Sequence, residues 1–406
     1  MYNRRDFIWN MLGTLFHSAN SFFFMTIVSR INGLADAGIL SFGIAIANII
    51  YIIALYGGRN YQVTDINDEI SASAYVTFRL FSAPITAFMA AALLLAFSYR
   101  TDKYLIILMI CLIKCVEAIS DVFHGITQKN DRLDIVGKSF FFKNLVALLI
   151  FFAIDFIFTN TLYAVIGWMV ISLLFLVLYD IPVAIRFVSI HLRPGYQFAT
   201  IITKCFFTCA FTTASLFVIS IPRYFIDFML NDEAQGIFGI IVMPATIVMI
   251  LGQFIVNPVL NDLARSYDKK DIRRFIGLIV SLVLIIFCFA LVALLLAYLF
   301  GIPVLEAVFN IELNSHKIHL VMIIIGASFY TITTILSVAL ITMRHTAIQL
   351  ILYSMTGILS AFLSWFLVSS YQLSGGFYSY LLTMGFVFLL YLSAFSLYAV
   401  KARTKR

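Results

Sequence analysis

Charge is what this sequence has least of. Only 12% of its 406 residues are Asp, Glu, Lys or Arg, whereas 62% are apolar. The apolar residues form stretches of about 20 residues between Phe7 and Val400, and most charges lie in the short segments between them. A helix of that length spans the hydrocarbon core of a bilayer, which is roughly 30 Å thick. The scarcity of charge therefore excludes a soluble globular protein and predicts an all-α polytopic membrane protein.

Long loops are also missing. The longest segments between apolar stretches, roughly 58–75, 258–274 and 301–317, are too short to hold a separate domain. The function is therefore expected to reside within the membrane. The first apolar segment is too long for a secretory signal peptide, and no small-residue cleavage site follows it.

The apolar stretches predict twelve transmembrane helices, with boundaries good to about four residues. They cover approximately 7–30, 37–57, 76–97, 104–124, 139–159, 161–185, 197–221, 236–257, 275–300, 318–341, 347–369 and 376–400. The divisions with the weakest sequence signal lie at Asn160–Thr161 and around Arg344. Grouped in sixes, the helices predict an N-terminal lobe at 1–190 and a C-terminal lobe at 195–406.

The distribution of basic residues predicts the orientation. With the N-terminus inside, eighteen of the 27 lysines and arginines fall on the cytoplasmic side, five fall on the outer side, and four lie within spans. Positive residues concentrate in the cytoplasmic loops of membrane proteins, so both termini are expected in the cytoplasm. Topology thus explains the net charge of +7, and no nucleic-acid partner is expected.

Cysteine and histidine are too few and too scattered to form a metal site. The cysteines all fall inside apolar spans, two pairs of them one helical turn apart: Cys111, Cys115, Cys205, Cys209 and Cys288. No His or carboxylate cluster completes a tetrahedral set with either pair. We expect them to be small residues at helix interfaces, with neither a disulfide nor a metal, and we expect no cofactor.

A faint internal repeat supports two halves of six helices. DAGILSFGI, from Asp36, aligns with DEAQGIFGI, from Asp232, and an arginine precedes each block, Arg30 in the first and Arg223 in the second. Repeats with an even number of helices share one orientation and are related by an axis along the membrane normal. Transporters built this way bind substrate between the halves. The repeat predicts that the halves superimpose by a rotation near 180° about that axis.

Three charges interrupt the fourth predicted span. Lys114 lies near its middle, about 15 Å from either end, and Glu117 and Asp121 follow at +3 and +7. The three project within about 60° of one another and form one polar stripe on the helix. A charge at mid-bilayer costs on the order of 3 kcal/mol, so the stripe is expected to face a cavity or a polar neighbour. The alternative is a purely structural ion pair between Lys114 and Glu117.

Three more basic residues lie one or two turns inside the cytoplasmic ends of spans: Arg79, Lys143 and Lys204. Together with Lys114 they predict a central cavity with a cationic inner half. Arg79 and Lys143 are shallow enough to extend to the lipid headgroups instead. Asp155 and Asp180 are interpreted as interfacial.

Four segments resemble the bacterial Wzx-type flippases, which move lipid-linked O-antigen or capsule repeat units across the plasma membrane. They are IALYGGRNYQVTDI (53–66), HGITQKNDRLDIVGKS (124–139), IPRYFIDFMLNDEAQGIFGI (221–240) and GQFIVNPVLNDLARSY (252–267). These flippases share a superfamily with the MATE drug exporters and the lipid II flippases. The resemblance implies two six-helix lobes around a central cavity, alternating access and an inner-membrane location.

The resemblance also implies site residues and partners. Cavity-facing basic residues of such flippases are thought to engage the substrate pyrophosphate, and the matching positions here are Arg30, Arg223 and, less closely, Arg59. The implied partners are an undecaprenyl-pyrophosphate-type oligosaccharide and membrane lipids, with a polysaccharide polymerase and chain-length proteins as further candidates. The driving force is left open among a proton, a sodium ion and the membrane potential. The chain lacks the length for the two extra C-terminal helices of lipid II flippases.

Other classes fit less well. A MATE-like cation antiporter is expected to have an acidic cavity, whereas basic residues outnumber carboxylates within these spans. A polysaccharide polymerase would carry a long outer loop, and an acyltransferase a characteristic histidine motif, which the six histidines do not form. The sequence therefore favours a transporter over an enzyme.

Overall fold

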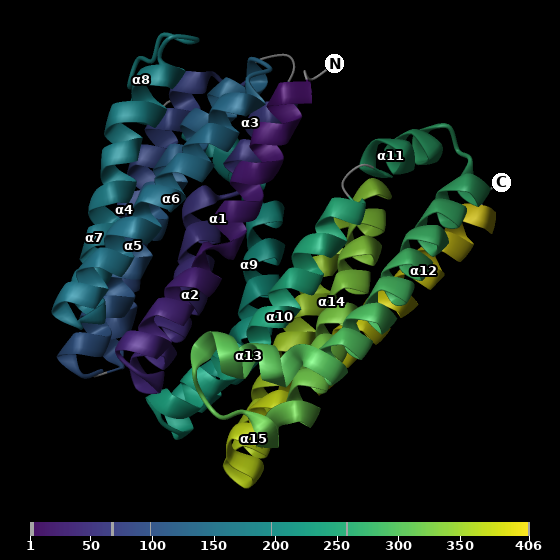
Figure 1. Cartoon of the computed structure of the whole chain (residues 1–406). Helices are drawn as coiled ribbons and strands as arrows, with labels where there is room; N and C mark the ends of the chain where they lie inside the picture. Colours follow the sequence, from purple (N-terminus) through teal and green to yellow (C-terminus); the bar gives the residue numbers. More distant parts are fainter. Residues whose placement is uncertain (1–3, 66–68, 98, 196, 257–258, 405–406) are drawn as a thin grey trace. The chain divides into compact units, whose positions relative to one another are not determined.

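The computed structural model describes residues 4–65, 69–97, 99–195, 197–256 and 259–404, and all of the regular structure in these ranges is helical (Figure 1). The chain forms two compact units, Met1–Thr213 (unit 1) and Ala214–Arg406 (unit 2). The boundary falls inside a helix rather than at the loop 190–195 where the sequence places it. The reason is that residues 197–213 pack in unit 1, where Gln197 bonds the backbone N–H of Ser71 and Lys204 pairs with Glu69.

Unit 1 holds six predicted spans and one short additional helix. Its elements are α1 (Arg4–Ile31), α2 (Leu34–Leu55), α3 (Gly58–Thr64), α4 (Ala72–Ala96), α5 (Thr101–Lys129), α6 (Leu133–Phe158), α7 (Thr161–Phe175), a π-helical segment (Leu176–Asp180) and α8 (Ile181–Ala184). α5 packs against α2, α3, α4, α6 and α7, so it is the central helix of unit 1.

Unit 2 begins within α9 (Phe198–Met229). It continues through α10 (Asp232–Val256), α11 (Leu260–Asp268), α12 (Ile272–Leu296), a second π-helical segment (Ala297–Gly301), α13 (Ile302–Phe309), α14 (Lys317–Thr342) and α15 (Thr346–Thr404). α14 packs against α10, α12 and α15.

α15 is two helices joined at a sharp bend. Gln372 there has φ 51° and ψ −131°, which is not helical. The two arms run antiparallel, because Thr383 donates to Ser360 at 3.0 Å and Tyr391 donates to Gln349 at 3.3 Å. The bend lies between the two spans predicted at 347–369 and 376–400.

The prediction of about twelve spans in two lobes is confirmed. In the described ranges, ten segments are long and apolar enough to cross a membrane. α15 counts as two spans, and α5 is absent from the ten because of its central charges. Large apolar side chains lie exposed along these helices, as lipid contact requires; Phe88 is 75% exposed and Ile358 76%.

Both weakly marked turns are also confirmed. α6 ends at Phe158 and α7 begins at Thr161, with the Asn160 side chain accepting from the N–H of Leu162 at 3.0 Å and so capping α7. α14 and α15 are separated at Arg344, which has φ 63°. The short helices α3, α11 and α13 lie where the sequence predicted only loops.

The internal repeat falls on matching hairpins. Asp36 lies in the first turn of α2, and Asp232 lies in the first turn of α10. Arg30 is in the last turn of α1, and Arg223 precedes the end of α9. The rotation that would relate the two units remains a prediction.

Four cysteines are buried, as expected for residues at helix interfaces: Cys111, Cys115, Cys205 and Cys209. Cys288 is exposed, so its expected place at an interface is wrong. The reason is that it lies on the outward face of α12, beside the exposed Phe287.

α1 and α6 cross at a contact that only glycine permits. A Cβ atom on Gly137 would lie 2.2 Å from the carbonyl oxygen of Trp9, and one on Gly13 would lie 2.1 Å from that of Gly137. Small residues allow such close backbone approach between membrane helices.

We expect Gly137→Ala to destabilise the protein by about 1–3 kcal/mol, because the new methyl group meets rigid backbone. The measurement is the thermal unfolding midpoint of the purified protein in detergent. Gly277→Ala is the matched control, since a Cβ on this α12 glycine meets no atom within 4 Å. Equal midpoints for the two variants would contradict the assigned crossing.

Candidate functional site

The polar stripe of α5 is buried inside unit 1. Lys114 Nζ lies 2.7 Å from Glu117 Oε2, and the side chains are 12% and 4% exposed. The Lys114 ammonium also lies 5.5 Å from the ring centre of Tyr51 on α2. The stripe therefore faces neighbouring helices, as predicted, and Lys114 and Glu117 form the ion pair given as the alternative.

Asp121, at the end of the stripe, pairs with an arginine from α3. Arg59 Nη1 lies 2.8 Å from Asp121 Oδ1, and Arg59 Nε and Nη2 donate to Gln128 Oε1 at 3.2 and 2.9 Å. The chain reaches this position because Tyr56 and Gly57 both adopt positive φ after α2. This reversal starts α3 at once and places Arg59 against α5.

Arg79 comes from α4 and is only 2% exposed. Its Nη1 donates to the carbonyl of Ala54, at the C-terminal end of α2, where backbone carbonyls lack helical partners and a cation is favoured. Gly58 allows this approach, because a Cβ there would lie 3.1 Å from Arg79 Nη2. Arg79 Nε has no partner among the described residues.

Lys143, on α6, is likewise 2% exposed, and its ammonium lies 5.6 Å from the ring centre of Phe140. The next residue, Asn144, bonds Asn20 at 2.9 Å and His17 at 3.1 Å, both on α1. Arg79 and Lys143 thus point into unit 1, and the alternative that they extend to the headgroups is wrong. Helix packing around α5 encloses both.

These six side chains form what we call the charged cluster: Arg59, Arg79, Lys114, Glu117, Asp121 and Lys143. Glu117 interacts electrostatically with Lys114 and Lys143, and Asp121 with Arg79. The charged cluster has four basic groups and two carboxylates, so it has an excess of two positive charges.

Three predicted site residues lie outside the cluster. Lys204 is exposed, pairs with Glu69 and lies 5.3 Å from the ring centre of Tyr61, so it does not join the buried lysines. Arg30 is exposed in the last turn of α1. Arg223 belongs to unit 2, where its guanidinium lies 5.7 Å from the ring centre of Phe238.

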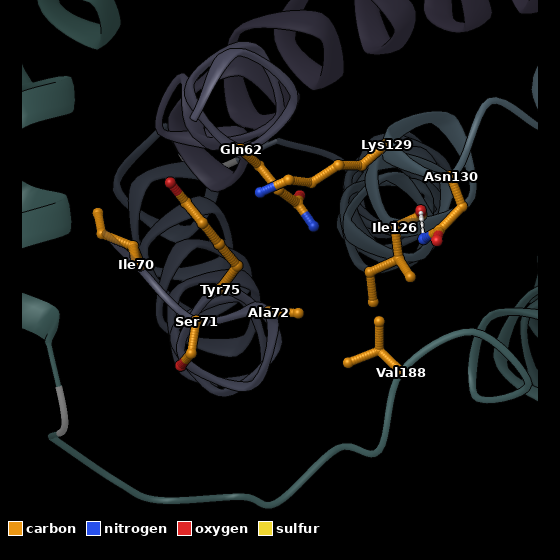
Figure 2. Close-up of a pocket in the computed structure, with 9 residues that line it drawn as sticks. All are labelled: Gln62, Ile70, Ser71, Ala72, Tyr75, Ile126, Lys129, Asn130 and Val188. Atoms are coloured by element: carbon orange, nitrogen blue, oxygen red, sulfur yellow. Dashed lines mark hydrogen bonds between the residues drawn. The ribbon is translucent and has the colours of Figure 1, made fainter. Parts of the chain in front are cut away.

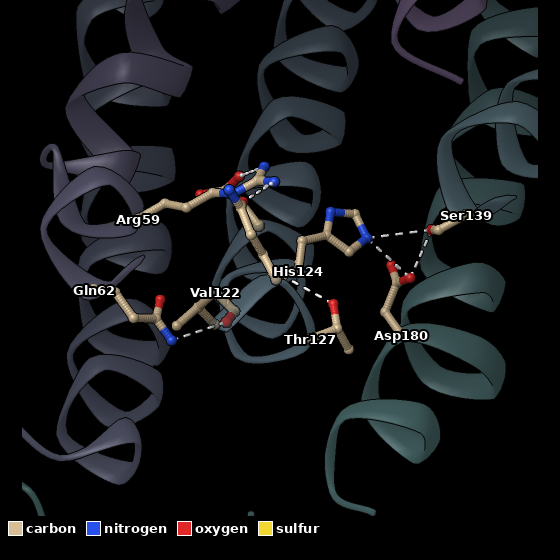
Figure 3. Close-up of polar contacts among 9 residues, drawn as sticks. Arg59, Gln62, Val122, His124, Thr127, Ser139 and Asp180 are labelled. Carbon is tan, nitrogen blue, oxygen red and sulfur yellow. Dashed lines mark hydrogen bonds and ion pairs between the residues drawn. The ribbon is translucent and has the colours of Figure 1, made fainter. Parts of the chain in front are cut away.

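Asp155 and Asp180 are buried in protein, and their interfacial depth stays a prediction. Asp155 accepts from Asn32 Nδ2 at 2.6 Å. Asp180, in the π-helical segment, accepts from Ser139 at 2.6 Å and lies 3.1 Å from His124 Nε2 (Figure 3). These bonds satisfy one oxygen of each carboxylate, whereas Oδ2 of both Asp155 and Asp180 has no partner among the described residues.

The contact among His124, Ser139 and Asp180 was missed, because the sequence separates the three residues widely and no spacing links them. His124 Nε2 faces both Ser139, at 3.2 Å, and Asp180. A proton relay to a nucleophilic serine needs the two ring nitrogens of a histidine to face different partners. Here both partners face the same ring nitrogen, Nε2. The contact therefore joins α5, α6 and the π-helical segment and does not form such a relay. Among the described residues, no three His, Cys, Asp or Glu side chains are placed to hold a metal ion.

Known proteins share this architecture. No family model matches the chain. The capsular polysaccharide biosynthesis protein CapF of Staphylococcus aureus is 23% identical over 333 residues, which cover 80% of this chain and 82% of CapF.

Solved structures agree over nearly the whole length. An inward-facing multidrug resistance MATE transporter of the MOP superfamily has a TM-score of 0.73 at 11% identity, covering 97% of this chain and 99% of that one. This chain has a MATE-like fold. The lipid II flippase MurJ has a TM-score of 0.71 at 12% identity, covering 95% and 87%. The resemblance to flippases of this superfamily, first noted in four sequence segments, is confirmed, and the protein is a multi-pass membrane protein.

Removing one partner of the buried pair should destabilise the MATE-like unit 1. Lys114→Gln leaves Glu117 buried without its ammonium, which costs about 3–5 kcal/mol, whereas Lys114→Gln with Glu117→Gln removes both charges and retains the shape. We expect a lower thermal midpoint for the single variant and recovery in the double variant. A single variant as stable as wild type would contradict the pairing.

Proposed function

We propose that this protein is a flippase that moves a polyprenyl-pyrophosphate-linked oligosaccharide across the bacterial plasma membrane by alternating access. The oligosaccharide would be a repeat unit of capsule or O-antigen, and both termini would lie in the cytoplasm. The observation on which the proposal depends is the excess of two positive charges in the charged cluster, buried in a MATE-like fold.

The charge balance suits a pyrophosphate. Such a group carries about two negative charges, and each charge in the bilayer interior costs on the order of 3 kcal/mol without a partner. Lysine is a point charge with rotatable donors, and arginine binds phosphate in a bidentate geometry. Lys114 and Lys143 would admit the headgroup, and Arg223 and Arg30 would hold it in the outward-facing state.

The two named relatives support the same substrate class. CapF is described as a capsule biosynthesis protein and MurJ as a lipid II flippase. A polymerase and chain-length proteins would then receive the product. Neither role requires catalysis by this chain, and we propose that it is not an enzyme.

The membrane potential is a sufficient driving force for an anionic cargo. Moving two negative charges from the inner to the outer face releases about 4–5 kcal/mol at 100 mV. Coupling to a proton or a sodium ion is the alternative.

Multidrug antiport is the second candidate function, because a MATE transporter matches the fold over nearly its full length. A cationic drug would be repelled by the basic excess of the cluster, which is why we rank this function second.

Deleting the gene should separate the two functions. For a flippase, we expect lipid extracts to accumulate one lipid-linked oligosaccharide on the cytoplasmic side, and surface polysaccharide to disappear. The same strain should keep its resistance to cationic drugs. Unchanged lipids together with increased drug sensitivity would favour the antiporter and contradict our proposal.

Charge-removing variants should abolish or sharply reduce surface polysaccharide while the protein remains in the membrane. The informative pair is Arg223→Gln and the double variant Lys114→Gln with Glu117→Gln, since the double variant avoids an unpaired carboxylate. Charge-keeping changes should be milder at Lys114 (Lys114→Arg) than at Arg223 (Arg223→Lys), because bidentate geometry is lost in the second case. Normal export by the double variant would show that the Lys114–Glu117 pair is only structural.

A further inference from the structure

Exposed basic residues gather where α11 meets α12 in unit 2. Five of them fall within ten residues and form what we call the basic patch: Arg265, Lys269, Lys270, Arg273 and Arg274. Three aspartates lie in the same stretch, Asp262, Asp268 and Asp271, so two positive charges remain in excess. The charge distribution predicts that this end of α12 is on the cytoplasmic side.

The protein supplies no partner for most of these side chains. Within the described ranges, no ion pair or side-chain hydrogen bond is made by Arg265, Lys269, Arg273 or Arg274. The two last arginines stand in the first turn of α12, where unpaired backbone N–H groups already favour an anion. Asp271 caps the helix by accepting from the N–H of Arg274 at 3.0 Å, but the first turn itself has no acidic residue. The side chains and the helix end therefore favour the same kind of ligand, an anion.

Other basic residues on the predicted cytoplasmic side have partners within the protein. Arg132 and Lys138 both pair with Asp134, at 2.8 and 2.9 Å. Figure 2 shows Lys129 extending from the end of α5 toward α3, and its Nζ donates to the backbone carbonyl of Asp65 at 2.6 Å. These three cations are engaged inside unit 1, so they offer less to a ligand than the basic patch does.

The two arginines of α12 lie on the side of the helix that faces lipid. Positions 7, 11 and 18 residues further along a helix lie within about 20° of the first position. The large apolar residues at these positions are exposed, counting first from Arg273 and then from Arg274: Val280, Leu284 and Leu291, and Ile285 and Val292. The opposite side of α12 is buried in unit 2, as Phe275 and Ile279 show with 1% exposure each.

The depth of these arginines matches the lipid headgroups. Val280 lies about 10 Å from Arg273 along the helix axis, at 1.5 Å per residue. Because exposed apolar residues mark the hydrocarbon, Arg273 and Arg274 lie in the headgroup layer just outside it. Basic clusters beside the cytoplasmic end of a membrane helix attract anionic lipids. A position above lipid favours such a lipid over an acidic protein in the cytosol.

We propose that the basic patch binds the phosphate of an anionic phospholipid in the cytoplasmic leaflet. Arg273 and Arg274 contact the phosphate, and the acyl chains lie along the exposed apolar side of α12. Arg265, Lys269 and Lys270 add to the positive potential. Arginine suits this ligand because a guanidinium binds phosphate oxygens in a bidentate geometry. The site belongs to unit 2 and does not depend on which substrate the protein transports.

Native mass spectrometry of the full-length protein in detergent micelles tests the site. Dissociation constants are measured for three probes: anionic phosphatidylglycerol, zwitterionic phosphatidylcholine and polyprenyl pyrophosphate. The double variant Arg273→Gln with Arg274→Gln removes the contact, and Arg273→Lys with Arg274→Lys keeps the charge. Arg186→Gln with Arg193→Gln is the matched control, because it removes two exposed arginines from the same predicted side, in the non-helical segment after α8.

We expect wild type to bind phosphatidylglycerol more tightly than phosphatidylcholine. Each arginine should contribute about fivefold, so the glutamine variant should bind phosphatidylglycerol roughly twenty- to thirtyfold more weakly and phosphatidylcholine as before. The lysine variant should lose only a few fold, and the control should keep the preference of wild type. Because all four side chains are exposed, every variant should keep the thermal midpoint of wild type.

Four results would overturn the proposal. The first is equal affinity of wild type for phosphatidylglycerol and phosphatidylcholine. The second is an equal loss in the control variant, which would make the preference an effect of net charge alone. A loss confined to polyprenyl pyrophosphate would identify that lipid as the ligand of the patch. Unchanged binding of phosphatidylglycerol by the glutamine variant would leave the arginines to the cytosol and to an acidic protein surface there.

Discussion

The cost of placing charge in hydrocarbon determines how unit 1 is built. α5 has three charged residues on one face within its predicted membrane span, and lipid cannot solvate them. The helix must therefore be surrounded by others, and it packs against α2, α3, α4, α6 and α7. Each of these except α7 also places a polar or charged group against α5 or its neighbours: Tyr51, Arg59, Arg79 and Lys143. The most polar predicted span is thus the organising helix of the bundle.

The ion pairs of the cluster can also be exchanged. A buried pair contributes little net stability, since desolvation offsets the Coulombic attraction, but breaking it without replacement is costly. Under the proposed function, an incoming pyrophosphate would replace a carboxylate as the partner of Lys114 or Arg59, so the change in energy would stay small. The two positive charges that the cluster has in excess would supply the net attraction. A transporter needs this combination, because its substrate must bind and also leave.

The sequence predicted the spans well because the lipid around a membrane helix requires a continuous run of apolar residues, and such a run can be recognised within the helix itself. The turn at Asn160 and the break near Arg344 were visible for the same reason, since polar or capping residues interrupt the run. The sequence did not predict α3. This helix has only seven residues and follows two residues with positive φ, so it is too short for an apolar periodicity to indicate a helix. Because α3 was not predicted, the pairing of its Arg59 with Asp121 was not predicted either.

The site was predicted less completely because contact partners lie far apart in the chain. The stripe at Lys114, Glu117 and Asp121 followed from helical spacing alone. Whether Lys204 and Asp180 were buried depended on which helix lay beside each of them, and the spacing within one helix does not show this. Lys204 pairs with Glu69 at the surface, whereas Asp180 accepts from Ser139 and contacts His124 in the interior.

α3 is attached to α5 through two polar side chains. Arg59 pairs with Asp121, and Gln62, one turn later, donates to the Val122 carbonyl (Figure 3). A helix this short has little stability of its own, because nucleation is unfavourable and few hydrogen bonds follow. Its position therefore depends on Arg59 bonding to Asp121 and Gln128 and on Gln62 bonding to the Val122 carbonyl, all on α5. Under the proposed function, a phosphate that competes for Arg59 would weaken one of these attachments and leave the bond from Gln62 to the Val122 carbonyl in place.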